Sequence, residues 1–389
     1  MRRTGYTGSF WPSPTQEALL RMILGHDERV LERWRALQPL DIDTLEVGSF
    51  CLLPHVHSRL SALAPDEPLL PRLAGTYRNT WYRNQLRLER LSRLVASLDQ
   101  QGIETVVVGG ATIAARWYAQ LGLRPIAQLE VAVDSTDAQT VTEAARGEGW
   151  RGTQSTREYA RFVDDGMVLV VHAGAPPDLA GTMGSDAALR ELAAHSQELE
   201  LGEVRVRVLD ALDEMLFACA LGARAALPPT VQWLLDAAQV LASPNRPQPA
   251  SLIQRAGRFR LVPSLRATVA YLDEVAETLD LRELAAGLQS ALVPTRDILA
   301  FRLNGGAGRV GVASQTLANH VRATAADSLP HAVARLPSHL QMAWGLESIS
   351  QVPSAALRKL VRRTRRPPMP QSGPPGGDHS LPQKHSTLS

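Results

Sequence analysis

Cysteine and lysine are both scarce in this chain. Its 389 residues include two cysteines, Cys51 and Cys219, which lie far apart and in no Cys-x-x-Cys cluster. A disulfide framework and a structural zinc site built from clustered thiolates are therefore not expected. Of the 41 basic residues, only Lys359 and Lys384 are lysine, a bias typical of GC-rich bacterial genomes. Single arginines are consequently weak evidence for phosphate binding.

Long hydrophobic runs are also missing. The longest, Ile103–Val108 and Met167–Val171, are too short to cross a bilayer. The N-terminus has no apolar core after Arg2 and Arg3, so a secretory signal is not expected and the cytoplasm is the default location. The net charge of +2 creates no overall field that would draw the protein to nucleic acid or anionic lipid, so nucleic acid is not an expected partner.

The remaining composition is that of a globular protein with a sizeable core, and its pattern divides the chain into four parts. Residues 12–100 have apolar spacing near that of an α-helix, which predicts an N-terminal helical segment ending at Gly102. Residues 101–208 change period and predict a small α/β core. Residues 209–366 are helical again, and the Pro/Gly/Ser-rich residues 367–389 predict a disordered tail.

Within these parts the pattern predicts individual elements. The expected strands are Ile103–Val108, Ala127–Val133, Arg161–Val163, Met167–Val171 and Val204–Val208. The expected helices are 15–24, 30–37, 54–63, 73–100, 111–120, 136–147, 210–226, 229–242, 249–257, 264–278, 281–291, 293–302, 315–326 and 331–346.

The chemistry-bearing segment runs from the first strand to the second. Gly109-Gly110 follows a strand and opens a helix, a context in which backbone N–H groups and the helix dipole can receive a phosphate. Gln128 and Glu130 stand two apart on the next strand, so their side chains share a face. In a nucleotidyl-transfer site, paired carboxylates at such a spacing hold divalent ions against a triphosphate.

These residues resemble the bacterial nucleotidyltransferase family proteins of the minimal nucleotidyltransferase superfamily. The family pattern is a strand, Lys-Gly and small residues, a helix ending in Tyr, Arg-x-x-x-Asp-hydrophobic-Asp, and a later strand carrying Asp-Leu-His. Here the matching positions are Gly109-Gly110, Tyr118, Arg124, Gln128-Leu129-Glu130 and Val170-Val171-His172. The similarity covers about residues 12–350 and is most specific over 103–172.

The resemblance implies an α+β fold, a nucleotidyltransferase-like mixed sheet core with an N-terminal helical segment and a C-terminal helical domain. It also implies transfer of a nucleoside monophosphate from an NTP to an unknown acceptor with Mg²⁺. Gly109, Gly110 and Arg124 would bind the nucleotide, and Gln128 and Glu130 would occupy the catalytic positions. Glu130 would be the metal ligand.

This chain departs from the family at each metal-binding position. Gln128 and Val170 stand where the family has aspartates, and Glu130 is longer than the aspartate it replaces. Mg²⁺ prefers several anionic oxygens, so one glutamate predicts weak binding and weakened or lost activity. The alternative is a non-catalytic pseudoenzyme that uses its cleft for a ligand or its helices for a protein partner.

Other polar residues near the motif have competing interpretations. Asp134 is a weak candidate as a substitute ligand, and His172 is more readily a packing residue than a functional one. Asp236 is expected to be a structural hydrogen-bonding partner. The basic residues between Arg358 and Arg366 fit a solvated helix end, with an acidic partner, nucleic acid or anionic lipid as the sharper alternative.

Overall fold

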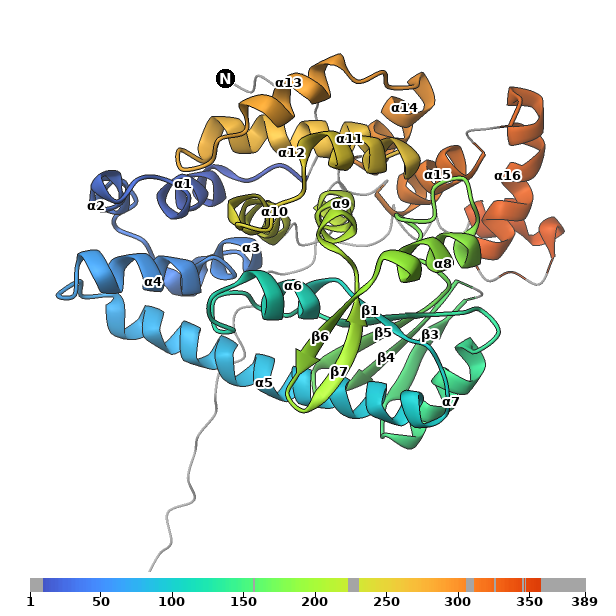
Figure 1. The fold of residues 1–389 in the computed structure, drawn as a ribbon, viewed down its shortest axis with the longest axis horizontal. Coiled ribbons are helices and arrows are strands. Elements are labelled where there is room, and N and C mark those ends of the chain that lie inside the picture. The colour runs from blue at the N-terminus through green and yellow to red at the C-terminus, as the bar shows by residue number, and fades with distance from the viewer. Residues whose placement is uncertain are drawn as a thin grey trace, which may run out of the picture.

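A seven-stranded mixed sheet lies between two layers of helices (Figure 1). The computed structural model describes residues 10–156, 158–222, 231–305, 311–324, 327–344, 346 and 348–357. The strands, in the order β3-β4-β5-β2-β1-β7-β6, are Arg151–Ser155, Tyr159–Asp164, Met167–Ala173, Leu129–Val133, Val106–Val108, Val204–Val208 and Gln197–Leu201. Central β1 is antiparallel to β2 and parallel to β7, and β2 is parallel to β5.

Alternate residues of the central strands enter different cores. Val107, Val131 and Val133 belong to the cluster beneath the sheet, which α5 (Leu70–Gln100) and α7 (Ala138–Gly147) cover. Val108 and Ala132 belong to the larger cluster on the opposite face. Because side chains alternate along a strand, Glu130 shares the face of Ala132 and points toward the second helical layer.

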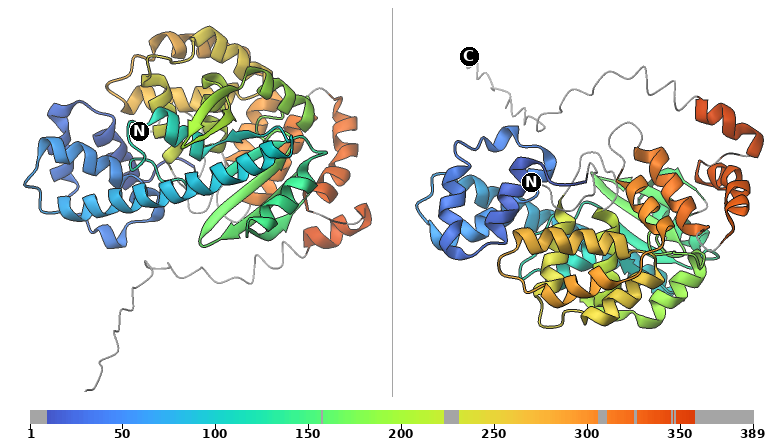
Figure 2. Two further views of the ribbon diagram at one scale, coloured as in Figure 1. Left: turned by 60° about the horizontal axis from the view of Figure 1, so that its bottom comes forward. Right: turned by 90° about the horizontal axis from the view of Figure 1, so that it is seen from above.

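The N-terminal helices are α1 (Pro14–Ile23), α2 (Asp27–Ala36), α3 (Val47–Phe50) and α4 (Leu53–Leu63). They lead into α5, which runs along the lower edge of the molecule in Figure 1 and across the front in the left view of Figure 2. Ser13 caps α1 with a complete capping box, in which its hydroxyl accepts from the Gln16 N–H and the Gln16 side chain accepts from the Ser13 N–H.

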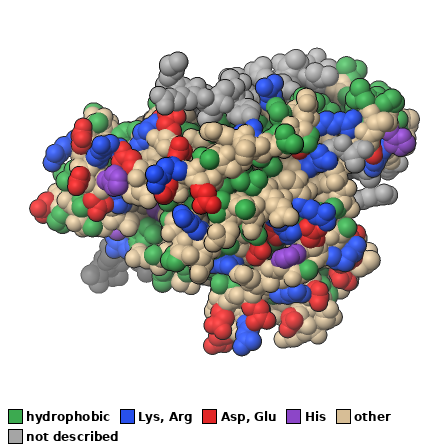
Figure 3. Space-filling model, turned by 45° about the horizontal axis from the view of Figure 1, so that its top comes forward, with side chains coloured by type: hydrophobic (Ala, Val, Ile, Leu, Met, Phe, Trp, Pro, Cys, Tyr) green, Lys and Arg blue, Asp and Glu red, His purple; other side chains and the backbone are tan. Residues whose placement is uncertain are grey.

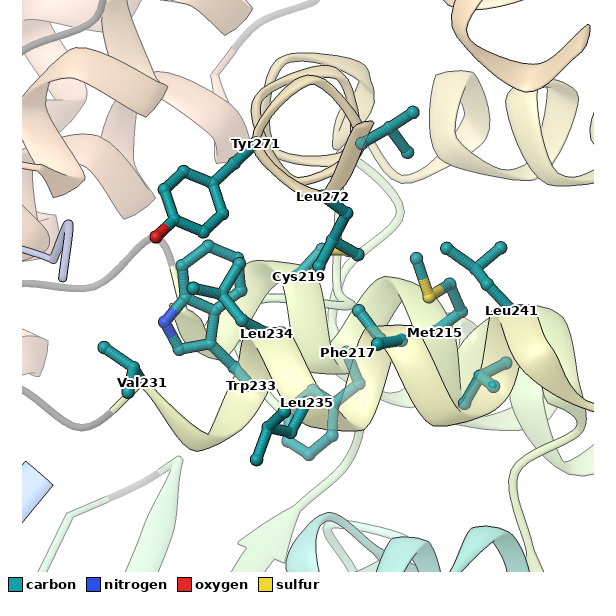
Figure 4. Close-up of a cluster of buried hydrophobic side chains, with 14 of the residues drawn as sticks. Met215, Phe217, Cys219, Val231, Trp233, Leu234, Leu235, Leu241, Tyr271 and Leu272 are labelled. Carbon is teal, nitrogen blue, oxygen red and sulfur yellow. The ribbon is translucent and has the colours of Figure 1, made fainter. Parts of the chain in front are cut away.

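The helices after the sheet form the other layer. They are α9 (Ala211–Gly222), α10 (Gln232–Ala242), α11 (Pro249–Arg258), α12 (Val262–Val275), α13 (Arg282–Ser290), α14 (Thr295–Asn304), α15 (Gly311–Ala323) and α16 (Leu329–Ala343). Two further helices, α6 (Gly110–Trp117) and α8 (Ser185–His195), come between strands in the sequence. Met215, Phe217 and Cys219 of α9 pack among side chains of α10 and α12, including Trp233 and Leu272 (Figure 4). This packing buries an apolar core over the face of the sheet that carries Glu130.

The expected α+β architecture is confirmed, and most predicted elements appear within a few residues of their expected bounds. Strands β3 and β6 and helices α3 and α8 were not predicted. The strand expected to begin at Ile103 begins at Val106, and the helix expected directly after Ser135 begins at Ala138. The expected tail, 367–389, and the basic residues between Arg358 and Arg366 lie outside the described residues. In the part of the chain that the structure describes, no helix is long and apolar enough to cross a membrane.

Candidate functional site

The turn between β1 and α6 places a glycine pair beside the acidic strand. Gly109 is the residue before α6 and has a φ of 80°, a conformation that favours glycine over any residue with a Cβ. Gly110 is the first residue of the helix. Thr112 supports the turn by donating its hydroxyl hydrogen to the Gly109 carbonyl at 3.0 Å. The strand-turn-helix arrangement predicted for this segment is therefore present.

Glu130 is the centre of the candidate site. Its side chain is buried, with the whole residue 4% exposed. Gln128 donates from Nε2 to Glu130 Oε1 at 2.9 Å, and His172 Nε2 lies 3.0 Å from Glu130 Oε2. Strand β5 supplies His172 because it pairs in parallel with β2, with Glu130 opposite Val170 and Ala132 opposite His172. The structure thus adds His172 to Gln128 and Glu130, which their spacing had already placed on one face.

Each glutamate oxygen is matched to a donor from this chain. When the imidazole Nε2 carries its hydrogen, it donates to Oε2, while the Gln128 amide donates to Oε1. The other imidazole nitrogen of His172, Nδ1, is buried and has no hydrogen-bond partner. The packing role expected for His172 therefore needs extending, because the ring also forms a direct polar contact with the central carboxylate.

Arg124 faces a different carboxylate. It donates from Nε and Nη2 to the two oxygens of Asp236 on α10, at 2.8 and 2.7 Å. Tyr118 donates its hydroxyl hydrogen to Asp236 at 2.7 Å, and all three residues are buried. The adjacent negative charge of Asp236 raises the pKa of Arg124 despite burial, and burial raises the pKa of Tyr118. Asp236 is therefore a structural hydrogen-bonding partner, and Arg124 ties the segment before β2 to the second helical layer.

Both glycines make room for side chains of the site. A Cβ on Gly109 would lie 2.8 Å from Glu130 Oε1, and a Cβ on Gly110 would lie 2.5 Å from Arg124 Nη1. The backbone at the turn is therefore approached closely by Glu130 and Arg124. This internal packing gives the glycine pair a structural reason that does not involve a phosphate.

Two functional-site neighbours carried no clear signal in the sequence. Glu214 on α9 is buried beside Arg116 and Trp117 of α6, and burial raises its pKa to about 7. Asn84 on α5 donates to the carbonyls of Leu121 and Arg124 at 2.6 and 2.7 Å. Each has a polar neighbour in the sequence, Asp213 beside Glu214 and Arg83 beside Asn84, and such a pattern does not distinguish a buried partner from a solvated side chain.

The sequence around this site matches a known protein family. A family model described as an uncharacterised nucleotidyltransferase matches residues 51–277. The chain belongs to this nucleotidyltransferase family. The match spans α4 to α12 and so contains the whole sheet, the glycine turn and every residue around Glu130. No curated protein matches the chain.

Proteins of a nucleotidyltransferase family are expected to use divalent metal ions and an NTP. The side chains around Glu130 show whether this chain has the ligands for such ions. Val170, at the third metal position, is an apolar residue directly opposite Glu130. Asp134 lies at the far end of β2, where it accepts from the N–H and hydroxyl of Thr136. Among the described residues, no three Asp, Glu, His or Cys side chains gather as metal ligands would. The residues around Glu130 do not fit a Mg²⁺ pair, which needs several anionic oxygens.

Proposed function

We propose that this protein is a non-catalytic member of its nucleotidyltransferase family, a pseudoenzyme that acts as a binding module. The observation that carries the proposal is the state of Glu130, the one carboxylate kept at the three metal positions. Its oxygens accept hydrogen bonds from Gln128 and His172 inside the protein. A buried acid satisfied in this way is stable without a cation.

The alternative, residual nucleotidyl transfer, requires one carboxylate to do the work of three. Two-metal catalysis uses the ions to neutralise charge that develops on the phosphates, and a single glutamate supplies half the charge of one divalent ion. Gln128 contributes only an uncharged amide, which donates toward Glu130 rather than offering it a second anionic neighbour. The geometry therefore favours the pseudoenzyme.

Calorimetric titration with ATP, in the presence and absence of Mg²⁺, tests this proposal on three proteins. These are the wild type, Glu130→Ala, and Glu203→Ala as a control at an exposed position outside the site. We expect no Mg²⁺-dependent binding in any of them. Tight binding that requires Mg²⁺ and disappears only in Glu130→Ala would establish residual chemistry and contradict the proposal.

A gain-of-function variant provides the complementary test. The combined substitution Gln128→Asp, Glu130→Asp and Val170→Asp restores three carboxylates on neighbouring strands, two of them opposite one another in the β2–β5 register. We expect this variant to bind Mn²⁺ measurably when the wild type does not. Equal Mn²⁺ binding by the two proteins would show that the residues at positions 128, 130 and 170 are not the reason why the wild type binds metal weakly.

A further inference from the structure

The exposed side of the first half of α5 combines arginines with large aromatic rings. Between Leu70 and Leu88 the helix has four arginines and no acidic residue, although acids and bases are nearly equal over the whole chain, at 39 and 41. Residues 237–272 also carry five arginines and no acid, but in α5 the arginines stand beside exposed aromatic rings. By contrast, acidic and basic side chains are mixed over the face shown in Figure 3.

The arginines at the middle of this helix lack acidic partners. Arg72 pairs with Asp43, Arg90 with Asp164 and Arg93 with Glu89. Within the described part of the chain, Arg78, Arg83 and Arg87 form no ion pair, and Arg78 and Arg83 are exposed to solvent. Partial burial and the neighbouring charge of Arg83 both lower the pKa of Arg87. Unpaired cations held this close repel one another, so an anionic partner would be stabilising.

Aromatic side chains stand between these arginines. Trp81 is 46% exposed and Tyr82 is 59% exposed, which is unusual for large rings on a helix whose opposite side enters the core. Tryptophan and tyrosine at adjacent positions with arginines on either side provide both stacking surfaces and cations. Proteins that bind single-stranded nucleic acid combine these two features.

We propose that the surface formed by Arg78, Trp81, Tyr82, Arg83 and Arg87, the α5 surface, binds single-stranded nucleic acid, with RNA as the probe of choice. Net charge gave no reason to expect such a partner, because the local excess is hidden in the total of +2. A membrane surface fits less well. The continuous apolar side of α5, including Leu88, Leu91 and Leu98, is already buried against the sheet and cannot enter a bilayer.

The inner side of α5 contacts the segment that leads to the family site. Asn84 lies on the same turns of helix and holds the carbonyls of Leu121 and Arg124, and its Oδ1 accepts from the Ile126 N–H. Tyr77 also donates its hydroxyl hydrogen to Gln120. These contacts lie on the inner side of α5, opposite the α5 surface, so they fix the helix in place without bringing a bound strand next to Gln128. The inference does not depend on whether Glu130 retains any metal.

Fluorescence anisotropy with labelled oligouridine, measured over a range of salt concentrations, tests the proposal on the full chain. The wild type should bind saturably at about 50 mM salt and lose affinity steeply as salt rises. Arg78→Ala combined with Arg83→Ala should weaken binding about tenfold and reduce the log–log salt slope by roughly 1.4, since each phosphate contact on a single strand contributes about 0.7. Trp81→Ala combined with Tyr82→Ala should weaken binding about tenfold with the slope unchanged, because stacking releases no counterions.

The matched control is Arg282→Ala combined with Arg302→Ala, two exposed arginines on α13 and α14, away from α5. It should bind like the wild type, and circular dichroism should show all variants folded. The proposal is overturned if the wild type does not bind saturably, or if the α5 variants bind as tightly as the wild type. Binding to anionic vesicles without binding to oligouridine would also overturn it, in favour of a lipid surface.

Discussion

The residue on which the site geometry depends most directly is Gly109. Its φ of 80° and the approach of Glu130 Oε1 to the position of a Cβ each oppose any other residue. We predict that Gly109→Ala lowers the free energy of unfolding by about 2 kcal/mol, from backbone strain and displacement of the Glu130 carboxylate. Urea denaturation measures this.

The control for that substitution is Gly147→Ala at the end of α7. A Cβ there meets nothing within 4 Å, and the residue is helical. Alanine should therefore leave stability unchanged or raise it by roughly 0.5–1 kcal/mol. A loss at Gly109 no larger than at Gly147 would contradict the tight turn seen beside Glu130.

Glu214 gives the protein a residue-scale dependence on pH. Burial raises its folded pKa to about 7 from the ordinary glutamate value of 4.5, so the folded state binds the proton more tightly than the unfolded state. Its contribution to stability is fully present below about pH 4.5 and is lost as the pH rises through about 7. This loss is on the order of 3 kcal/mol, at about 1.4 kcal/mol per pKa unit.

The substitution Glu214→Gln should remove that dependence, because glutamine is uncharged at every pH. Relative to the wild type, the variant should gain about 3 kcal/mol between roughly pH 5 and pH 8. The difference between proteins is the informative quantity, because burial lowers the pKa of His55 to about 4 and the wild type therefore also loses stability on acidification. Glu203→Gln, at an exposed turn, should show no such trend. If the free energy of unfolding of Glu214→Gln changes with pH in parallel with that of the wild type, the raised pKa of Glu214 is contradicted.

At the scale of elements, the sequence predicted the central strands and missed the edges. Strands β1, β2 and β5 consist mainly of valine, leucine and alanine, with Glu130 and His172 as exceptions, because they are largely buried on both faces. Strands β3 and β6 close the two edges of the sheet, and their sequences, Arg-Gly-Thr-Gln-Ser and Gln-Glu-Leu-Glu-Leu, are mostly polar. Polar edges discourage pairing with other chains, so the property that protects these strands also hides them from a hydrophobic pattern.

The site was predictable in the same uneven way. Glu130 and Gln128 could be placed on one face from their spacing, and the glycine turn from its position between strand and helix. The contact between Glu130 and His172 could not, because it depends on the register of β2 against β5, two strands far apart in sequence. Register is fixed by packing on both faces, which a single chain segment does not reveal.

The bridge between Arg124 and Asp236 couples the segment before β2 to α10, and its removal should be costly. Asp236→Ala leaves a buried guanidinium without its partner and should lower the free energy of unfolding by about 3–5 kcal/mol. The double variant Arg124→Met and Asp236→Leu removes both charges and should recover most of that loss. Urea denaturation of the single and double variants measures both free energies of unfolding. Equal losses in the two variants would show that Arg124 and Asp236 are not paired in the folded protein.

At the scale of the whole molecule, the helical regions before and after the sheet share one core. Phe10 lies 6.3 Å from Trp233 of α10 and 5.7 Å from Phe301 of α14, measured between ring centroids. Ion pairs join the same regions, including Arg21 with Glu274 and Arg33 with Glu277. The N-terminal segment and the C-terminal helices, although distinct in sequence, are therefore expected to unfold together.

Phe10→Ala tests that coupling because Phe10 is 3% exposed and contacts rings from the other end of the chain. We predict a loss of about 3–5 kcal/mol in the free energy of unfolding, from the buried area removed and the cavity left behind. Hydrogen exchange should accelerate in α10 and α14 as well as in α1. Phe50→Ala, at a phenylalanine that is 41% exposed in the same N-terminal region, should change stability by no more than about 0.5 kcal/mol. Faster exchange confined to α1 would instead make the N-terminal helices an independent unit, because a shared core transmits the loss of Phe10 to every helix that packs on it.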